Sequence, residues 1–143
     1  EHSVVKLQAT ESARGVAGLE FYRQFSGRVE AIRTSLIAEV GKWRKHGEVA
    51  AYGAAAKGST LLNYCGLDAD SIAFVVDRSP HKQGLFMPGV RVPIRPVEEL
   101  ASCQPSVTVL LAWNFEKEIL AQQAAYREAG GKFIIPIPEV RVV

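Results

Sequence analysis

Residues 50–60 read Ala-Ala-Tyr-Gly-Ala-Ala-Ala-Lys-Gly-Ser-Thr, which predicts the end of a buried strand, a tight turn and the start of a helix. Gly53 and the three alanines after it leave no side-chain bulk in the turn. Ser59 and Thr60 are natural residues for the first turn of a helix. A helix N-terminus presents unpaired N–H groups and a partial positive charge, and Lys57 would add a full charge. The stretch therefore predicts a turn that a ligand phosphate can approach closely.

Two known phosphate-binding loops resemble this turn without matching it. A Walker A loop has Gly-Lys-Ser/Thr in that order, whereas Lys57 precedes Gly58 here. A dinucleotide fingerprint has Gly-x-Gly-x-x-Gly, and alanine stands here in place of the second glycine. On the sequence alone we interpret the spacing from Gly53 to Gly58 as a coincidence. A tight strand–helix turn that binds no ligand stays open as the alternative.

The rest of the chain alternates short apolar runs with helical patterns. Strands are expected at residues 48–52, 72–76, 107–112 and 132–135, with an extended piece at 90–94, and helices at residues 16–46, 58–65, 97–101 and 115–129. Residues 1–15 show no clear period, and the first helix either breaks near Ser26-Gly27 or bridges to a neighbouring part. The pattern predicts an α/β chain: a Rossmann-like three-layer fold with a mostly parallel sheet, preceded by a long N-terminal helix. We divide it into residues 1–46 and a compact domain at residues 47–143.

Three polar clusters directly follow expected strands, at residues 53–59, 77–83 and 113–114. Ligands of such sheets sit beyond the carboxyl ends of the strands, so these clusters are expected at one edge. Asp77 stands where an acidic residue binds a ribose hydroxyl in doubly wound folds, although a strand-end cap is the alternative. Lys82 and Gln83 can contact phosphate or base edges, or Lys82 is simply solvated.

Trp113 and Asn114 follow the expected strand at residues 107–112. The tryptophan can cover a ligand ring or pack on the rim of the core. The asparagine offers a donor and an acceptor, and it can equally cap a helix that begins at Phe115. No Ser-His-Asp or Cys-His arrangement and no general acid–base pair is evident, so the residues describe a binding domain.

Composition limits the classes of function. The 143 residues carry a formal net charge of +2, too small to argue for nucleic acid or an acidic membrane as partner. No apolar run approaches the roughly 20 residues that span a bilayer. The two cysteines lack metal-ligand spacing, which predicts a cytoplasmic protein with reduced thiols and Cys65 packed in the core. The chain begins at Glu1 without a methionine, so we expect a piece of a longer protein.

Several separated blocks resemble the C-terminal domain of S-adenosylmethionine-dependent sugar C-methyltransferases. The blocks are residues 51–66, 77–83, 88–89, 92–94, 111–114 and 130–134, within a similarity that spans roughly residues 47–140. The resemblance implies a substrate-binding domain for the nucleotide diphosphate of a deoxy- or keto-sugar. It also implies that S-adenosylmethionine, zinc and the catalytic residues belong to other domains of the same polypeptide. No cofactor, metal or catalytic residue is expected in this chain.

The resemblance and the expected topology together imply roles for the clusters. Residues 53–59 would hold the diphosphate, residues 77–83 would contact the nucleoside, and residues 113–114 would line the edge of the pocket. The residues expected to contact the nucleotide are Gly53, Ala54, Ala56, Lys57, Gly58, Ser59, Asn63, Asp77, Lys82, Gln83, Trp113 and Asn114. Two alternatives stay open: a free-standing regulatory nucleotide-binding module, and a structural or dimerisation domain.

Overall fold

The computed structural model describes residues 2–143, which form two compact units. The first unit ends at Ala31 and the second comprises Ile32–Val143. The division falls inside helix α2 (Leu19–Trp43), which belongs to both. The boundary between residues 46 and 47 that the sequence suggested stays a prediction.

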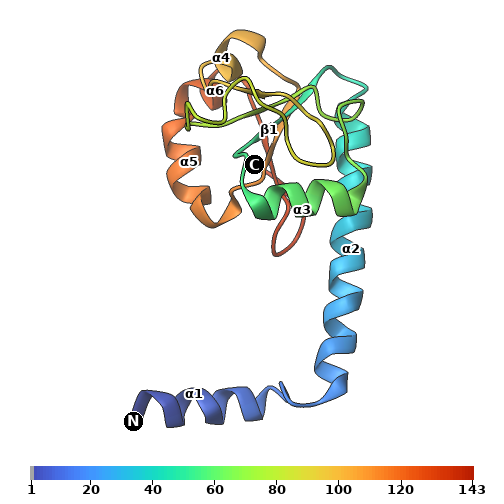
Figure 1. Cartoon of the computed structure of the whole chain (residues 1–143), viewed down its shortest axis with the longest axis vertical. Helices are drawn as coiled ribbons and strands as arrows, with labels where there is room; N and C mark the ends of the chain where they lie inside the picture. Colours follow the sequence, from blue (N-terminus) through green and yellow to red (C-terminus); the bar gives the residue numbers. More distant parts are fainter. Residues whose placement is uncertain (1) are drawn as a thin grey trace. The chain divides into compact units, whose positions relative to one another are not determined.

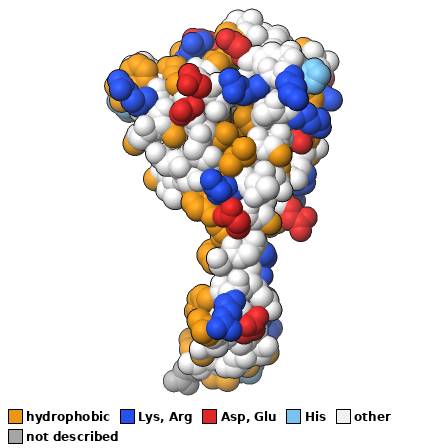
Figure 2. Space-filling model, turned by 90° about the vertical axis from the view of Figure 1, so that its right-hand side faces the viewer, with side chains coloured by type: hydrophobic (Ala, Val, Ile, Leu, Met, Phe, Trp, Pro, Cys, Tyr) orange, Lys and Arg blue, Asp and Glu red, His pale blue; other side chains and the backbone are white. Residues whose placement is uncertain are grey.

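The first unit consists of helix α1 (His2–Ala13) and the first part of α2. The sequence pattern missed α1, because the helix buries no residue and so has no apolar stripe to detect. Helix α2 continues through Ser26 and Gly27 without a break. Large hydrophobic side chains lie at the surface of this unit (Figure 2): Val4, Val5, Leu7, Leu19, Tyr22 and Phe25.

The second unit is built on a six-stranded sheet in the order β3-β2-β1-β4-β5-β6. The strands are β1 (Val49–Tyr52), β2 (Phe74–Val76), β3 (Ile94–Arg95), β4 (Val107–Leu110), β5 (Phe133–Ile135) and β6 (Arg141–Val142). Strands β1 to β5 are parallel, and only β6 runs antiparallel to its neighbour. The chain winds outward from β1 to β3 and then returns to β4 on the other side of β1. The winding therefore reverses between β1 and β4.

Helices cover both faces of the sheet and produce three layers (Figure 1). On one face, Leu36 and Val40 of α2 and Leu62 of helix α3 (Ala56–Cys65) pack against Ala51 and other buried strand residues. On the opposite face, helices α4 (Glu99–Cys103), α5 (Glu116–Gln122) and α6 (Ala124–Glu128) supply Leu100, Ile119 and Tyr126. Both faces are buried, which is why the strands read as continuous apolar runs.

The alternation along β1 shows how one strand serves both layers. Val49 and Ala51 belong to the cluster under α2 and α3, whereas Ala50 and Tyr52 belong to the cluster under α4 to α6. Cys65 is buried in the first of these clusters, as expected from the sequence. The predicted Rossmann-like α/β fold with a mostly parallel sheet is confirmed.

Two features at the C-terminal side differ from expectation. The helix expected at residues 115–129 is a 3-10 turn, η1 (Trp113–Phe115), followed by α5 and α6, which are separated at Gln123. Gln123 has φ −98° and ψ 27°, outside the helical range, and therefore separates α5 from α6. The sequence did not predict strand β6, because its side chains are exposed and carry no apolar pattern. Arg141 fixes it by donating to both carboxylate oxygens of Glu116, at 2.7 and 2.6 Å.

Candidate functional site

The candidate site lies where β2, β1 and β4 end side by side. The turn that begins at Gly53 follows β1, the loop that begins at Asp77 follows β2, and Trp113 follows β4. Because these three strands are neighbours and parallel, their carboxyl ends share one edge of the sheet. Segments that are more than 20 residues apart in the sequence meet there, as the contacts below show.

Two glycines shape the turn after β1. Gly53 has φ +95°, and a Cβ added there would lie 2.8 Å from the Cβ of Ala112. A Cβ on Gly58 would lie 2.8 Å from the Cβ of Leu111, so this glycine lets α3 pack closely on the end of β4. These are the tasks of the first and third glycines of a dinucleotide fingerprint. The spacing that we interpreted as a coincidence therefore has a structural reason.

Helix α3 begins two residues earlier than expected, at Ala56, and has no side-chain N-cap. Within residues 2–143, the N–H groups of Ala56, Lys57 and Gly58 donate to no hydrogen-bond acceptor. Ser59 lies one turn further along, with its N–H bonded to the carbonyl of Ala55. The helix start thus presents three available N–H donors directly after the small-residue turn.

The Asp77 side chain ties the turn after β1 to the loop after β2. Its Oδ2 accepts a hydrogen bond from the N–H of Ala54 at 2.7 Å, and its Oδ1 accepts one from the N–H of Ser79 at 2.8 Å. The Asp77 side chain is only 11% exposed. Asp77 therefore serves as the strand-end cap that the sequence left open as an alternative. A carboxylate can accept more hydrogen bonds than these, so a contact between Asp77 and a ribose hydroxyl stays a prediction.

Lys82 and Gln83 also turn inward onto this junction. Lys82 Nζ donates to the carbonyl of Ala54 at 2.9 Å and lies 3.2 Å from Asp77 Oδ2. Gln83 Nε2 donates to the carbonyl of Asp77 at 2.9 Å. Lys82 is therefore not simply solvated. The loop residues that were expected to reach a nucleotide brace the turn instead, and their contact with a ligand stays a prediction.

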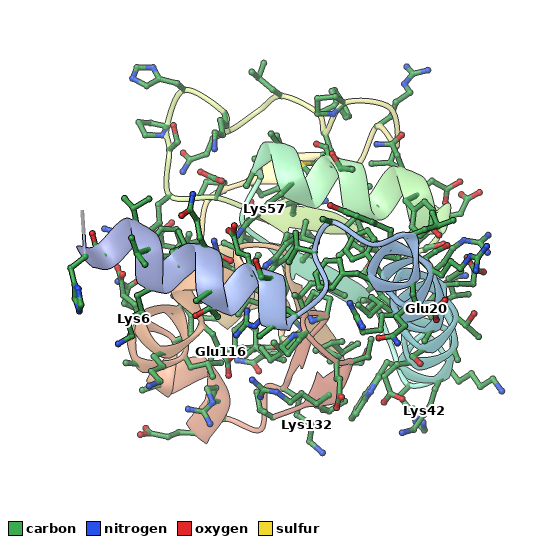
Figure 3. All side chains as sticks on the ribbon, turned by 90° about the horizontal axis from the view of Figure 1, so that it is seen from below. Lys6, Glu20, Lys42, Lys57, Glu116 and Lys132 are labelled. Carbon is green, nitrogen blue, oxygen red and sulfur yellow. The ribbon has the colours of Figure 1, made fainter. Side chains whose placement is uncertain are left out.

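Lys57 and Trp113 form the outer part of the site. The ammonium of Lys57 lies 4.2 Å from the centroid of the Trp113 ring, a cation–π contact that joins α3 to the end of β4. Figure 3 labels Lys57 at the beginning of α3. Among the residues that the structure describes, no carboxylate pairs with this ammonium. The contact orients a positive charge that belongs to the second residue of α3, at the same helix start as the three available N–H groups.

Two expected residues take up other tasks. Asn63 lies two turns along α3, and its Nδ2 donates to the carbonyls of Ser59 and Pro88 at 2.8 and 2.9 Å. It anchors the loop before β3, where a Cβ on Gly89 would overlap the Asn63 amide. Asn114 is exposed within η1, and no side-chain cap hydrogen bond forms at η1 or α5. The capping role considered for Asn114 is therefore wrong.

A second hollow opens on the other face of the sheet, at the same edge. We call it the Tyr52 cavity; its volume is about 270 Å³, and its lining includes Tyr52, Asp77, Arg78, Phe115, Glu118 and Gln122. Sequence reasoning selected only Asp77 of these six. A signal was present in Tyr52, a polar-tipped aromatic residue that ends an otherwise small and apolar strand. Burial raises the pKa of Tyr52, and the nearby Arg78 opposes that shift.

Two further observations complete the description of residues 2–143. No helix in this range has the length and apolar character needed to span a bilayer. The same range contains no group of three or more His, Cys, Asp and Glu side chains placed to hold a metal ion.

The fold and the edge just described define a Rossmann-like α/β domain with a glycine-dependent turn at the reversal of winding. The chain belongs to the C-methyltransferase C-terminal domain family, whose model matches residues 1–138. It is similar to the C-methyltransferase NovU of Streptomyces niveus, with 41% identity over 142 residues. That alignment covers 99% of this chain and 34% of the relative, so the chain spans about a third of the relative's length.

Proposed function

We propose that this chain is the substrate-binding domain of an S-adenosylmethionine-dependent C-methyltransferase, a transferase that acts on a nucleotide-linked deoxy- or keto-sugar. Family membership supports the C-methyltransferase part of this proposal. The sugar nucleotide is the finer part, and it rests on the edge of the sheet. S-adenosylmethionine, zinc and the catalytic residues belong, in this proposal, to other domains of the same polypeptide in the cytoplasm.

The observation that carries the nucleotide assignment is the unneutralised positive charge at the start of α3. Lys57 is held against Trp113, and it lies at the beginning of a helix whose first N–H groups have no acceptor. Backbone donors, the helix dipole and an ammonium together favour a phosphate group. Asp77 already occupies the N–H of Ala54, so the diphosphate would lie toward Lys57 and away from that carboxylate.

The contribution of this domain to catalysis would be positioning. Binding energy gained at the nucleotide, far from the reacting carbon, orients the sugar toward the methyl donor. A domain with this task needs no general base of its own. In this proposal, residues at the edge of the sheet supply the groups that bind the anion and the ring.

Calorimetry on the purified chain tests the proposal. We expect a nucleoside diphosphate to bind, and Lys57→Ala to weaken its binding by about 1–3 kcal/mol, the range for hydrogen bonds to charged groups. Lys45→Ala is the matched control, because it removes the same charge from an exposed lysine that follows α2. Absence of nucleotide binding to the unmodified chain at millimolar concentration would overturn the assignment.

A further inference from the structure

The Tyr52 cavity lies on the face of the sheet opposite α3, yet it shares an edge with the proposed phosphate site. Gly53 and Asp77 line it and also form the turn and loop described above. Its remaining lining comes from the last residue of β1, the loop after β2, the end of β4, η1 and α5. A volume of about 270 Å³ lies just below the roughly 300–1,000 Å³ range of sites that enclose drug-sized ligands. The cavity therefore fits one part of a nucleotide.

The hydroxyl of Tyr52 is the unusual feature of this cavity. Tyr52 is 3% exposed, and its hydroxyl oxygen is a buried side-chain polar atom without a hydrogen-bond partner among the described residues. The Gln123 side chain approaches closely enough to lower the pKa of Tyr52 but does not reach hydrogen-bond geometry. Leaving a buried hydroxyl unpaired is costly, and such groups are rare in folded proteins.

A second buried tyrosine on this face of the sheet has a hydroxyl whose hydrogen bonds are all made within the protein. Tyr126 is 2% exposed, and its hydroxyl bonds to Thr108 Oγ1 at 3.1 Å and to the carbonyl of Pro105 at 3.2 Å. The charged groups that act on the Tyr52 hydroxyl are instead Arg78, Asp77 and Glu118, all of which line the cavity. Tyr52 thus lines the cavity together with these three charged groups, and its hydroxyl is unpaired among the described residues.

The rim of the cavity carries an exposed aromatic ring and an exposed ion pair. Phe115 is 59% exposed, and no ring contact involves it within residues 2–143. Arg78 and Glu118 form an ion pair at 3.7 Å from the end of β2 to α5, and both side chains are more than half exposed. Exposed pairs of this kind contribute little stability and open easily. An incoming ring would therefore meet an aromatic face and little resistance.

We propose that the Tyr52 cavity binds the heteroaromatic base of the nucleotide, with its ring on Phe115 and a polar edge at the Tyr52 hydroxyl. Stacking on an aromatic side chain accepts any planar base, whereas a hydroxyl that donates or accepts one hydrogen bond selects a polar edge. The base and the diphosphate would then lie on opposite sides of the turn at Gly53. This inference rests on the proposed function and adds the place and chemistry of base recognition.

The test compares ligands that share the diphosphate and differ in the base. The five common nucleoside 5′-diphosphates and inorganic pyrophosphate are titrated calorimetrically into the unmodified chain and into Tyr52→Phe, Phe115→Ala and Lys57→Ala. We expect Tyr52→Phe to weaken the preferred nucleoside diphosphate about tenfold and Phe115→Ala to weaken it by about 5- to 150-fold. Neither variant should change pyrophosphate binding, whereas Lys57→Ala should weaken both ligands. Tyr22→Phe, at an exposed tyrosine, is the matched control.

Thermal unfolding without ligand gives a second, independent readout. Tyr52→Phe removes an unpaired buried hydroxyl, so we expect its melting temperature to equal or exceed that of the unmodified chain. A lower melting temperature would mean that the hydroxyl has a structural partner, and it would overturn the inference. The base-binding inference, but not the proposed function, also fails if Tyr52→Phe binds the nucleoside diphosphate as tightly as the unmodified chain does. It fails likewise if the substitution weakens pyrophosphate binding as much as nucleoside diphosphate binding. Binding of neither ligand to the unmodified chain would overturn the proposed function itself.

Discussion

The carboxylate of Asp77 accepts hydrogen bonds from two backbone N–H groups and lies 3.2 Å from an ammonium. It therefore fixes the turn after β1 relative to the loop after β2, and both proposed subsites border that junction. The sequence placed Asp77 correctly at the end of its strand. It could not show that the carboxylate points back to Ala54, because that direction depends on how two loops far apart in the chain meet.

Replacing Asp77 with asparagine should destabilise the fold. The amide cannot satisfy all three donors, and its own NH₂ group would face one of them. We expect the free energy of unfolding to fall by about 1.5–3 kcal/mol, measured by urea denaturation. Asp70→Asn, in an exposed turn, is the control and should change stability by less than about 0.5 kcal/mol. Equal stability of the two variants would show that the Asp77 carboxylate has no structural task.

Tyr126 makes stability depend on alkaline pH. Burial raises the pKa of this phenol above its ordinary value of 10.0. The protonated phenol is favoured in the folded state, so its stabilisation is complete below pH 10 and is lost as pH rises through the folded pKa.

The difference in free energy of unfolding between the unmodified chain and Tyr126→Phe should therefore be smaller at high pH than at neutral pH. At about pH 8 we expect the free energy of unfolding of the variant to be about 1–3 kcal/mol lower than that of the unmodified chain, because Thr108 and the carbonyl of Pro105 lose their partner. At about pH 11 the difference should be smaller. Only the unmodified chain carries Tyr126, whose raised pKa in the folded state lowers the free energy of unfolding as the pH rises. Urea denaturation at both pH values measures this. A gap that stays constant with pH would contradict the shift.

Among the elements, the buried strands were predictable, whereas the exposed strand β6 and several helix limits were not. Strands β1 and β4 are buried on both faces, so their apolar runs are visible in the sequence. Helix α3 starts at Ala56 and not near Ser59, because packing of Gly58 on Leu111 fixes the helix and no side-chain cap is needed. Helix α1 buries nothing, and its exposed residues carry no periodic signal.

The close approach of α3 to β4 gives a prediction for Gly58. Alanine in a helix interior is usually more stable than glycine by about 0.5–1 kcal/mol. At Gly58, however, the new methyl would lie 2.8 Å from the Leu111 Cβ, which belongs to a buried strand end and cannot move aside easily. We expect Gly58→Ala to lower the free energy of unfolding by about 1–3 kcal/mol in urea titrations.

Gly41 in α2 is the matched control, because a Cβ there meets nothing within 4 Å. Gly41→Ala should raise the free energy of unfolding by about 0.5–1 kcal/mol. Two substitutions of the same kind should thus have opposite signs. Stabilisation by Gly58→Ala would show that α3 can shift away from β4, and that the glycine has no packing task.

For the whole molecule, the sequence predicted one side of the candidate site and missed the other. The three clusters at the carboxyl ends followed from strand order, and the contact of Lys57 with Trp113 links two of them. The Tyr52 cavity could not be predicted, because it depends on the path of η1 and α5, and the sequence predicted a single helix over residues 115–129 there. A site assembled from strand ends is thus easier to infer than one that depends on a helix break.

The two compact units give a prediction at the scale of the whole chain. Among the described residues, every member of both core clusters lies at or beyond Leu36, so residues 2–31 add nothing to the cores of the second unit. We expect a shortened chain of residues 32–143 to unfold cooperatively in urea, with a free energy within about 0.5 kcal/mol of the full chain. A chain of residues 44–143 also loses Leu36 and Val40, which are buried against the sheet. Each such loss costs about 2–5 kcal/mol in comparable cores, so this second chain should be unfolded or lose cooperativity. If the 32–143 chain were equally unstable, the division inside α2 would be wrong.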